Sequence, residues 1–516
     1  MRKLFRHAAA DIPASIVVFL VALPLCLGIA LGSGTPIFSG IISGIIGGLV
    51  VGAISGSHLS ISGPAAGLIT VISLYMQELG SFQVLLLAVL IAGLIQILLA
   101  LVKAGMIADF IPVAVIKGMM AAIGIMLILK QLPHLVGYDA DFEGDESFFQ
   151  PDGHNTFTEL KMAWLQLTPF AMCLGLVGLA IQYVWDRPAM KKRQWTRFLP
   201  GPLLVVILSV VLNEAMKRLF PDFAIRAEHM VNVPVITNWD SLSSVLSSPD
   251  FSRIGDSTVW MAGITIGAIA SLESLLSIEA TDNLDPEGRI SPPNRELLAQ
   301  GVGNISAAFL GGLPVTAVVV RSTANISGGA RTRLSALLHG VLLALLVLLL
   351  PSLLNRIPYA ALAAILCYVG FKLASPSLVR QSYRLGWDVF LPFVITVVAI
   401  LLSDLLLGVI IGLLVGVFFV IRSNFRKSLI VVHLDNNYMI KLMNQVSFLN
   451  KSLLKNALMN IPDESSLLFD FSKCIFADSD IRTMILEFAE DAPSRGIRVD
   501  YRFLNEDQKV KLKMPV

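Results

Sequence analysis

The feature that most limits what this chain can fold into is a set of long runs without a charged side chain. The first extends from Ile12 to Gln77 and contains no Lys, Arg, Asp or Glu. Similar runs recur at 79–102, 162–185, 297–320, 334–355 and 405–421. Each is long enough, or nearly so, for a helix to cross a bilayer, which takes roughly 20 apolar residues. The lipid bilayer is therefore the expected surroundings of most of the chain.

These runs are apolar on every face, whereas the strands of a membrane β-barrel alternate polar and apolar residues. Helices are expected, because a backbone in lipid must satisfy its hydrogen bonds internally. Only 15% of the 516 residues are charged, against roughly 25% in soluble domains. The net charge of +2 predicts no nucleic-acid partner. The four cysteines lack metal-ligand spacing and no ATP-binding loop or catalytic triad is present, so we expect neither a metal centre nor an enzyme.

The sequence predicts fourteen membrane segments, at about 12–31, 37–55, 64–77, 82–102, 107–132, 166–185, 200–217, 258–280, 294–312, 315–326, 333–351, 357–373, 388–403 and 405–421. Lys and Arg precede the first segment and follow the sixth, twelfth and fourteenth. An even count places all of these on one side, which the positive-inside rule makes cytoplasmic. Both chain ends are then cytoplasmic in a multi-pass protein of the cell (inner) membrane. The loop 133–160, with seven acidic residues and no Lys or Arg, is expected to be external.

A transmembrane transport domain is thus expected over residues 1–425, followed by a cytoplasmic domain over 429–516. In this tail, strand-like runs at 429–434, 439–443, 467–471 and 497–503 alternate with helical stretches at about 448–460 and 479–492. The pattern predicts a small α/β domain with helices on one face of a sheet.

Two of the membrane segments are too short and start with small residues and a proline, in HLSISGPAAG (58–67) and GGLPVTA (311–317). Proline is tolerated in the first turn of a helix, so each segment is expected to start as a half-helix inside the membrane. Pro64 and Pro314 are 250 residues apart, which predicts two repeats of seven segments, at about 10–218 and 257–422. Interrupted segments at matching places point to a transporter site at the midplane. Two facing helix N-termini would hold an anion there.

Two charged residues lie inside predicted segments and are candidates for the site. A carboxylate in mid-membrane, Glu273, requires a cavity, a cation or a proton path. Arg321 lies seven residues after Pro314, two helical turns along the second half-helix, where it would act on a bound anion or pair with Glu273. Lys117, Lys130 and His339 are interpreted as structural, since long lysines snorkel to the membrane surface.

These motifs together resemble the SulP (sulfate permease) family. The resemblance rests on Asn294–Leu297, Gln300–Asn304, Ser62–Pro64, Gly311–Pro314 and the tail. It implies an all-α polytopic membrane domain of two inverted seven-helix repeats, with segments 1–4 and 8–11 as a core that moves against a gate of segments 5–7 and 12–14. It also implies a homodimer and a C-terminal STAS domain.

In that family the anion lies between the starts of segments 3 and 10, which implies an anion site at Ser62, Gly63, Ala65, Ala66, Pro314, Val315 and Thr316, beside the Arg321 inferred above. Sodium-coupled bicarbonate members hold Na⁺ with an acid and a hydroxyl four residues later, here Glu273 and Ser277. The hydroxyl expected in segment 10 is replaced by Val319, so either Na⁺ or H⁺ is a candidate coupling ion. Leu25 replaces a common Gln, which implies a more apolar pocket. In the tail, Ser479 matches a serine that some STAS domains have phosphorylated.

The leading hypothesis is a secondary active transporter of a small inorganic oxyanion, bicarbonate or sulfate, by Na⁺ or H⁺ symport or anion exchange. A nucleobase permease of the same fold would need an acid in segment 10, where this chain has Arg321. A membrane sensor or channel-like scaffold that signals through the STAS domain is the third reading.

Overall fold

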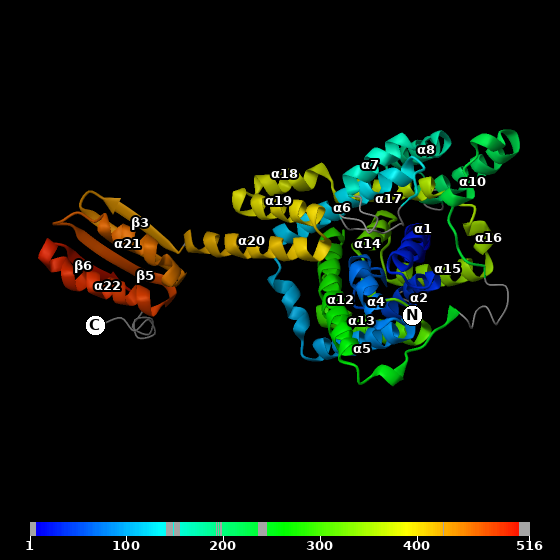
Figure 1. The fold of residues 1–516 in the computed structure, drawn as a ribbon. Coiled ribbons are helices and arrows are strands. Elements are labelled where there is room, and N and C mark those ends of the chain that lie inside the picture. Colours follow the sequence, from blue (N-terminus) through cyan, green and yellow to red (C-terminus); the bar gives the residue numbers. More distant parts are fainter. Residues whose placement is uncertain are drawn as a thin grey trace. The chain divides into compact units, whose positions relative to one another are not determined.

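The structure is a computed structural model that describes residues 7–140, 148, 155–191, 193, 196, 199–235, 245–426 and 428–504. The chain forms two compact units, residues 1–413 and 414–516, coloured along the sequence in Figure 1. Parts of the predicted external loop (141–147 and 149–154) and the last twelve residues of the predicted tail domain lie outside the described residues.

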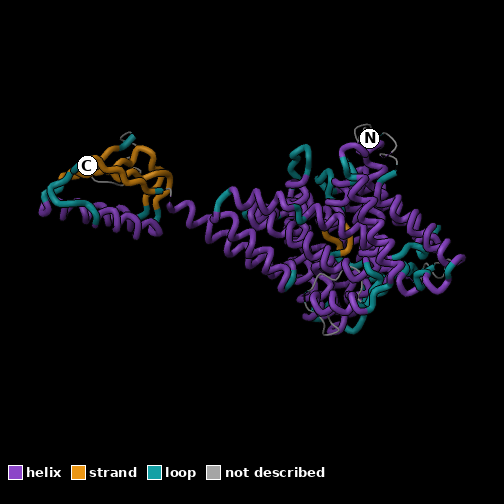
Figure 2. The backbone as a smooth tube through the Cα atoms, turned by 90° about the horizontal axis from the view of Figure 1, so that it is seen from above, coloured by secondary structure: helices purple, strands orange, loops and turns teal. Residues whose placement is uncertain are grey.

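A helix lies in each of the fourteen predicted segments, and helices dominate the first unit (Figure 2). The first seven segments contain α1 (Ala8–Gly32), α2 (Ile37–Ile46) continued to α3 (Gly52–Ile54), α4 (Ile69–Leu79), α5 (Phe82–Leu101), α6 (Val113–Leu135), α8 (Pro169–Trp185) and α10 (Gly201–Leu219). The second seven contain α12 (Ser257–Leu284), α13 (Pro293–Leu310), α14 (Val319–Ser327), α15 (Leu334–Leu349), α17 (Tyr359–Leu373), α19 (Trp387–Leu402) and α20 (Leu405–Arg426). Shorter helices not predicted from the sequence are α7 (Thr156–Leu165), α9 (Pro188–Lys191), α16 (Pro351–Leu354) and α18 (Pro376–Arg384).

Length and apolar composition alone make six of the described helices, or seven if the bent pair α7 and α8 counts as one span, able to cross a membrane. Helices α4 and α14 are too short to do so, as the sequence predicted for segments that start inside the bilayer.

The helix contacts repeat when the two halves of the first unit are exchanged. The first segment of each half packs on the third and fourth segments of the other: α1 on α14 and α15, and α12 on α4 and α5. Likewise, α13 packs on α5 and α2 packs on α15. A repeat of seven spans is odd, so the second copy starts on the opposite side of the membrane. This pattern is that of two inverted repeats.

The same contacts divide these helices into two bundles. Helices α1 to α5 and α12 to α15 pack mainly on one another, and we call them the core. Helix α6 packs on α17 and α19, and α8 packs on α10 and α17; with α20, the last predicted segment, they form what we call the gate. At the middle of the gate, α6 and α17 cross at two glycines: a Cβ on Gly124 would lie 2.6 Å from the Gly370 carbonyl oxygen, and the reverse distance is also 2.6 Å. Only glycine permits so close a crossing.

The two predicted half-helices are joined by a short sheet. Strand β1 (Ser62–Pro64) pairs antiparallel with β2 (Val315–Ala317), and Gly63 lies opposite Thr316. The expectation that each proline opens a helix is wrong: Pro64 lies in β1 and Pro314 precedes β2. A 3₁₀ turn (Ala66–Leu68) leads into α4, and α14 begins at Val319. Each extended segment satisfies its backbone through the other, so neither needs to be helical at that point.

Two loops meet at Asp139, and the even number of predicted membrane segments puts both on the same side of the membrane. Its carboxylate oxygens lie 2.5 Å from Nδ1 of His134 and 2.6 Å from Nδ1 of His229. Burial opposes the charged form of Asp139, but the two histidine contacts outweigh it and hold the pKa below its usual value. The contact with Asp139 raises the pKa of His229.

The second unit contains a small α/β domain with its own hydrophobic core. Its strands β3 (Leu429–Leu434), β4 (Asn437–Val446), β5 (Ser466–Ala477) and β6 (Arg498–Arg502) lie in that order. The pair β3–β4 is antiparallel, whereas β4–β5 and β5–β6 are parallel and are connected through α21 (Lys451–Met459) and α22 (Ser479–Asp491). Figure 2 shows these helices on one face of the sheet, as predicted. All four strands lie in or around the predicted runs.

Candidate functional site

Helix α13 holds the β1–β2 pair in place through a stripe of buried polar side chains. Glu296, Gln300 and Asn304 follow one another at four-residue spacing, which puts them on one helix face, and at most 1% of each residue is exposed. Gln300 Nε2 donates to Ser62 Oγ in β1 over 2.8 Å. Asn304 accepts from the backbone N–H of Val315 in β2 and donates to its carbonyl, over 2.5 and 3.0 Å.

Two serines from other helices, α12 and α14, complete this support. The hydroxyl of Ser274 in α12 accepts from the backbone N–H of Ala317 over 3.2 Å. Ser322 Oγ accepts from the N–H of Ile61 over 3.0 Å. The sequence analysis missed Asn304, Ser274 and Ser322 as positioning residues. Only the spacing of the α13 stripe signals such a role, because the serines lie in stretches that look like ordinary helix.

The prediction placed Arg321 two turns along the second half-helix. Helix α14 starts directly after β2, so Arg321 lies in its first turn instead. The residue is fully buried. Its Nη2 donates to Cys26 Sγ over 3.4 Å, and a Cβ placed on Gly63 would lie 1.9 Å from its Nη1. Nε and Nη1 have no hydrogen-bond partner among the described residues, and Arg321 forms no ion pair with any of their carboxylates.

An arginine stays charged in proteins, so Arg321 is a buried positive charge without a counter-charge in the described chain. Leaving such a charge unpaired costs several kcal/mol, roughly 3–5 in measured cases. The first N–H groups of α14 have no partner within the helix and add their positive end of the helix dipole. The start of α14 is therefore electropositive and suited to an anion.

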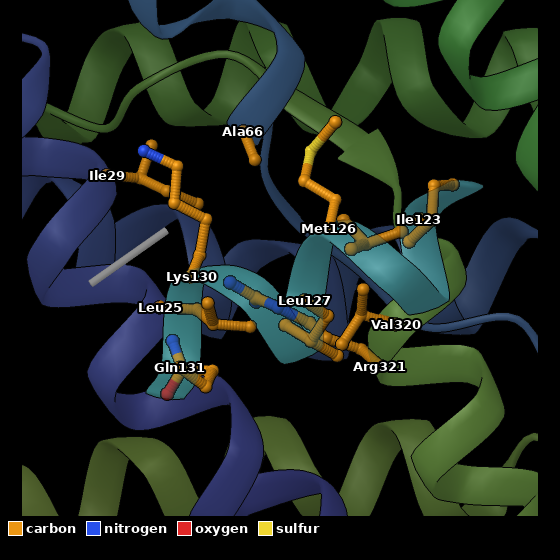
Figure 3. A pocket seen from close by; sticks show the side chains of 11 residues that line it. Leu25, Ile29, Ala66, Ile123, Met126, Leu127, Lys130, Gln131, Val320 and Arg321 are labelled. Carbon is orange, nitrogen blue, oxygen red and sulfur yellow. The ribbon is translucent and has the colours of Figure 1, made fainter. Parts of the chain in front are cut away.

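Arg321 lines a cavity between core and gate, which we call the Arg321 cavity (Figure 3). The core contributes Leu25 and Ile29 from α1, Ala66 from the start of the third segment, and Val318, Val320 and Arg321 from the second half-helix; the gate contributes Ile123, Met126, Leu127, Lys130 and Gln131 from α6. The resemblance led us to expect that Leu25 makes the pocket more apolar. Leu25 does line this cavity, and most of the other lining residues are apolar as well.

A second cavity, the Glu273 cavity, also lies beside the start of α14. It is lined by Glu273 and Ser277 from α12 and by Val319, together with Gly67, Met119, Ile123, Ile269, Leu276, Leu405 and Leu406. A Cβ on Gly67 would be 3.5 Å from the Glu273 carboxyl atoms. The structure thus brings the three positions predicted for a cation site to one cavity, and Val319 supplies no oxygen to it.

The residues implied as an anion site divide into two groups. Ala66 and Arg321 line the Arg321 cavity. The others are buried in or beside the strand pair and do not line that cavity: Ser62, Gly63, Ala65, Pro314, Val315 and Thr316. Among the residues set aside as structural, His339 is buried and Lys117 donates to Gln381 Oε1 over 3.1 Å. Lys130 instead lines the Arg321 cavity, a placement that the sequence analysis missed.

Comparison with protein families matches residues 9–399 to the sulfate permease family. The putative sulfate transporter YvdB of Bacillus subtilis is 29% identical over 419 residues, which cover 80% of this chain and 73% of that protein. The bicarbonate transporter BicA of Synechocystis is 28% identical over 332 residues, 64% of this chain and 53% of that protein.

Two solved structures have the same fold. The overall structure of SLC26A9 matches with a TM-score of 0.67 at 15% identity and covers 95% of this chain and 84% of that one. The transmembrane domain of a cyanobacterial bicarbonate transporter BicA matches with a TM-score of 0.55 at 24% identity and covers 80% and 98%. At these identities the likeness concerns the fold.

Proposed function

Because the chain belongs to the sulfate permease family, we propose that it is a secondary active carrier of a small inorganic oxyanion, bicarbonate or sulfate. Membership makes it an anion transporter and not an enzyme. The observation that carries the proposal is Arg321, a buried guanidinium without a carboxylate partner in the described chain, at a helix start and on a cavity wall. A bound oxyanion supplies the missing negative charge and accepts hydrogen bonds from the guanidinium.

The Glu273 cavity supports coupling to a cation. Glu273 and Ser277 line it together. A carboxylate and a single hydroxyl offer few oxygens, and Na⁺ needs several, so the cavity suits a proton at least as well as Na⁺. Because Arg321 and Glu273 flank the same helix start, their two ions attract each other when both are bound.

The division into core and gate supports an elevator-like motion. Both predicted ion sites lie where core helices face α6 of the gate. A core that slides along the gate would carry both ions without taking the strand pair apart. The homodimer and the STAS identity of the second unit remain parts of this proposal that rest on the resemblance. Ser479, exposed at the start of α22, remains its candidate phosphorylation site.

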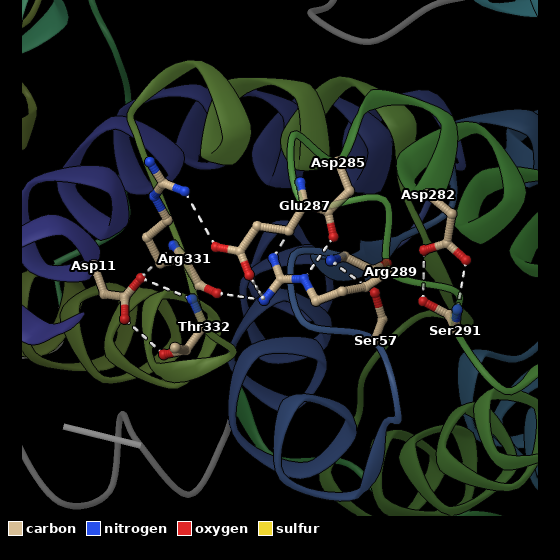
Figure 4. Close-up of polar contacts among 10 residues, drawn as sticks. Asp11, Ser57, Asp282, Asp285, Glu287, Arg289, Ser291, Arg331 and Thr332 are labelled. Carbon is tan, nitrogen blue, oxygen red and sulfur yellow. Dashed lines mark hydrogen bonds and ion pairs between the residues drawn. The ribbon is translucent and has the colours of Figure 1, made fainter. Parts of the chain in front are cut away.

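The proposed orientation, with both ends in the cytoplasm, is supported by a polar network among loops that an even count places on the side of the N-terminus (Figure 4). Asp11, near the start of α1, accepts hydrogen bonds from the backbone N–H groups of Arg331 and Thr332 over 2.7 and 3.0 Å. Arg331 pairs with Glu287, and Arg289 donates to the carbonyl of Arg331. The start of α1 and two separate loops meet there, and the even number of predicted membrane segments puts all three on one side.

The test is uptake of labelled sulfate and bicarbonate by proteoliposomes, with and without inward Na⁺ or H⁺ gradients. Arg321→Gln should abolish uptake and change the melting temperature little, because removal of an unpaired buried charge offsets the lost packing and the lost contact with Cys26. Glu273→Gln should abolish only the response to the gradient. Arg380→Gln, an exposed position on α18, is the matched control and should behave as the native chain. Normal uptake by Arg321→Gln, or uptake of nucleobases instead of anions, would contradict the proposal.

A further inference from the structure

The Arg321 cavity has a second cationic side chain on its opposite wall. Lys130 comes from α6 of the gate, whereas Arg321 comes from α14 of the core. Figure 3 shows the Lys130 side chain extending toward Ile29 of α1. Only 8% of this side chain is exposed, so protein covers the ammonium group, whereas a snorkelling lysine keeps its charge in water.

Lys130 differs from Arg321 in having a carboxylate beside it. Its Nζ lies 3.8 Å from Oε2 of Glu159, whose side chain is 5% exposed. Glu159 lies in the first turn of α7, and the Asn155 capping box fixes the start of that helix. The separation exceeds the roughly 2.7–2.9 Å of a direct charged hydrogen bond. Lys130 and Glu159 therefore form an ion pair without a direct hydrogen bond, and an anion placed closer to the ammonium group can compete with Glu159 for it.

The charges of this cavity distinguish two classes of anion. With Lys130 neutralised by Glu159, the wall offers one unbalanced positive charge, that of Arg321. A monovalent anion balances it completely. A divalent anion brings a second negative charge into a buried apolar cavity, where an unbalanced charge is costly, and Lys130 is the cation within the lining that can balance it.

We propose that Lys130 is a specificity-determining residue that leaves Glu159 to bind a divalent oxyanion of the sulfate class, together with Arg321. This inference rests on the proposed function and specifies that the transported anion can be divalent. Binding then joins a core cation and a gate cation through one anion. A monovalent oxyanion such as bicarbonate binds at Arg321 alone and leaves the Lys130–Glu159 pair intact.

The test compares sulfate with bicarbonate uptake in proteoliposomes at a pH where sulfate is divalent and bicarbonate monovalent. Lys130→Gln should lower kcat/KM for sulfate relative to bicarbonate by roughly tenfold or more, the effect of losing one buried charge contact. Lys130→Arg should keep much of the native ratio. Glu159→Gln should raise kcat/KM for sulfate relative to bicarbonate, because it removes the carboxylate that pairs with Lys130. Lys117→Gln, on the same helix, is the control and should leave the ratio unchanged.

An equal loss of both substrates in Lys130→Gln, or an unchanged ratio, would overturn the proposal. If that variant does not fold, an unchanged ratio in Glu159→Gln overturns it. Native uptake of bicarbonate without sulfate also overturns it and leaves the proposed function standing. If the native chain takes up neither anion, the proposed function fails. Sulfate-dependent thermal stabilisation that Lys130→Gln removes would then still support this role of Lys130, and its absence would refute it.

Discussion

At the scale of single residues, the closest packing in the site is between Gly63 and Arg321. A side chain at position 63 would occupy the place of the guanidinium, since its Cβ would lie 1.9 Å from Nη1. We expect Gly63→Ala to displace Arg321 and abolish anion uptake, with an overpacking cost of about 1–3 kcal/mol. Gly255→Ala, which meets no atom within 4 Å, is the control. Uptake that survives in Gly63→Ala would show that the guanidinium position does not matter.

The Asp139 cluster gives the fold a pH dependence with a definite sign. The raised pKa of His229 adds stability that is fully present below the pKa of an unfolded histidine, about 6.5, and is lost as the pH rises through the folded value. The lowered pKa of Asp139 adds stability above about pH 3.9 that is lost as the pH falls through its folded value. We expect His229→Asn to reduce the melting temperature at pH 5.5 more than at pH 8.5. An equal reduction at both would count against the linkage.

Among single residues, sequence reasoning found those whose type is unusual for their surroundings. Glu273 and Arg321 stand out because a charge inside an apolar run demands an explanation. Lys130 did not, because a lysine near a helix end has an ordinary interpretation, and its partner Glu159 is 29 residues away in a loop expected to be external. Which cavity a charge faces depends on how α6 is rotated against α14, and no local pattern records that.

At the scale of elements, helices were predictable and the strand pair was not. Hydropathy runs and two prolines are local signals, and they located both half-helices within a few residues. Strands of three residues carry no alternation to read, and β1 and β2 are about 250 residues apart in the sequence. Their pairing moved both helix starts beyond the prolines, which is why Arg321 lies in the first turn of α14.

The α13 stripe is the element on which the strand pair depends most. Asn304 binds both the N–H and the carbonyl of Val315, which is fully buried. Asn304 also donates to Oε1 of the buried Gln96 over 2.6 Å, so Asn304→Ala leaves three buried groups unsatisfied, at about 1–3 kcal/mol each. We expect a clearly lower melting temperature and loss of anion uptake. Ser306→Ala on the same helix removes only a hydrogen bond to the helix's own Val302 carbonyl and should change stability by no more than about 0.5 kcal/mol. Similar effects of both would refute this role of α13.

At the scale of the whole molecule, the two units have separate hydrophobic cores, and we expect them to unfold in separate transitions. Phe469 is fully buried in the second unit and stacks on Tyr501 at 5.8 Å. Phe469→Ala should destabilise that unit by about 3–5 kcal/mol and leave the first transition in place. Ile475→Ala in the same strand, at a residue 74% exposed, is the control. A shift of both transitions together in calorimetry would mean that the units unfold as one.

The β1–β2 pair also bears on how the two halves of the membrane unit can diverge after a duplication. Once Gly63 and Thr316 lie opposite each other, an insertion or deletion in one strand shifts the register of the other. A change in either half is then tolerated only with a compensating change in the other. The sequences of the two halves can diverge freely in their loops and lipid-facing helices. At the six residues of β1 and β2 they can change only together.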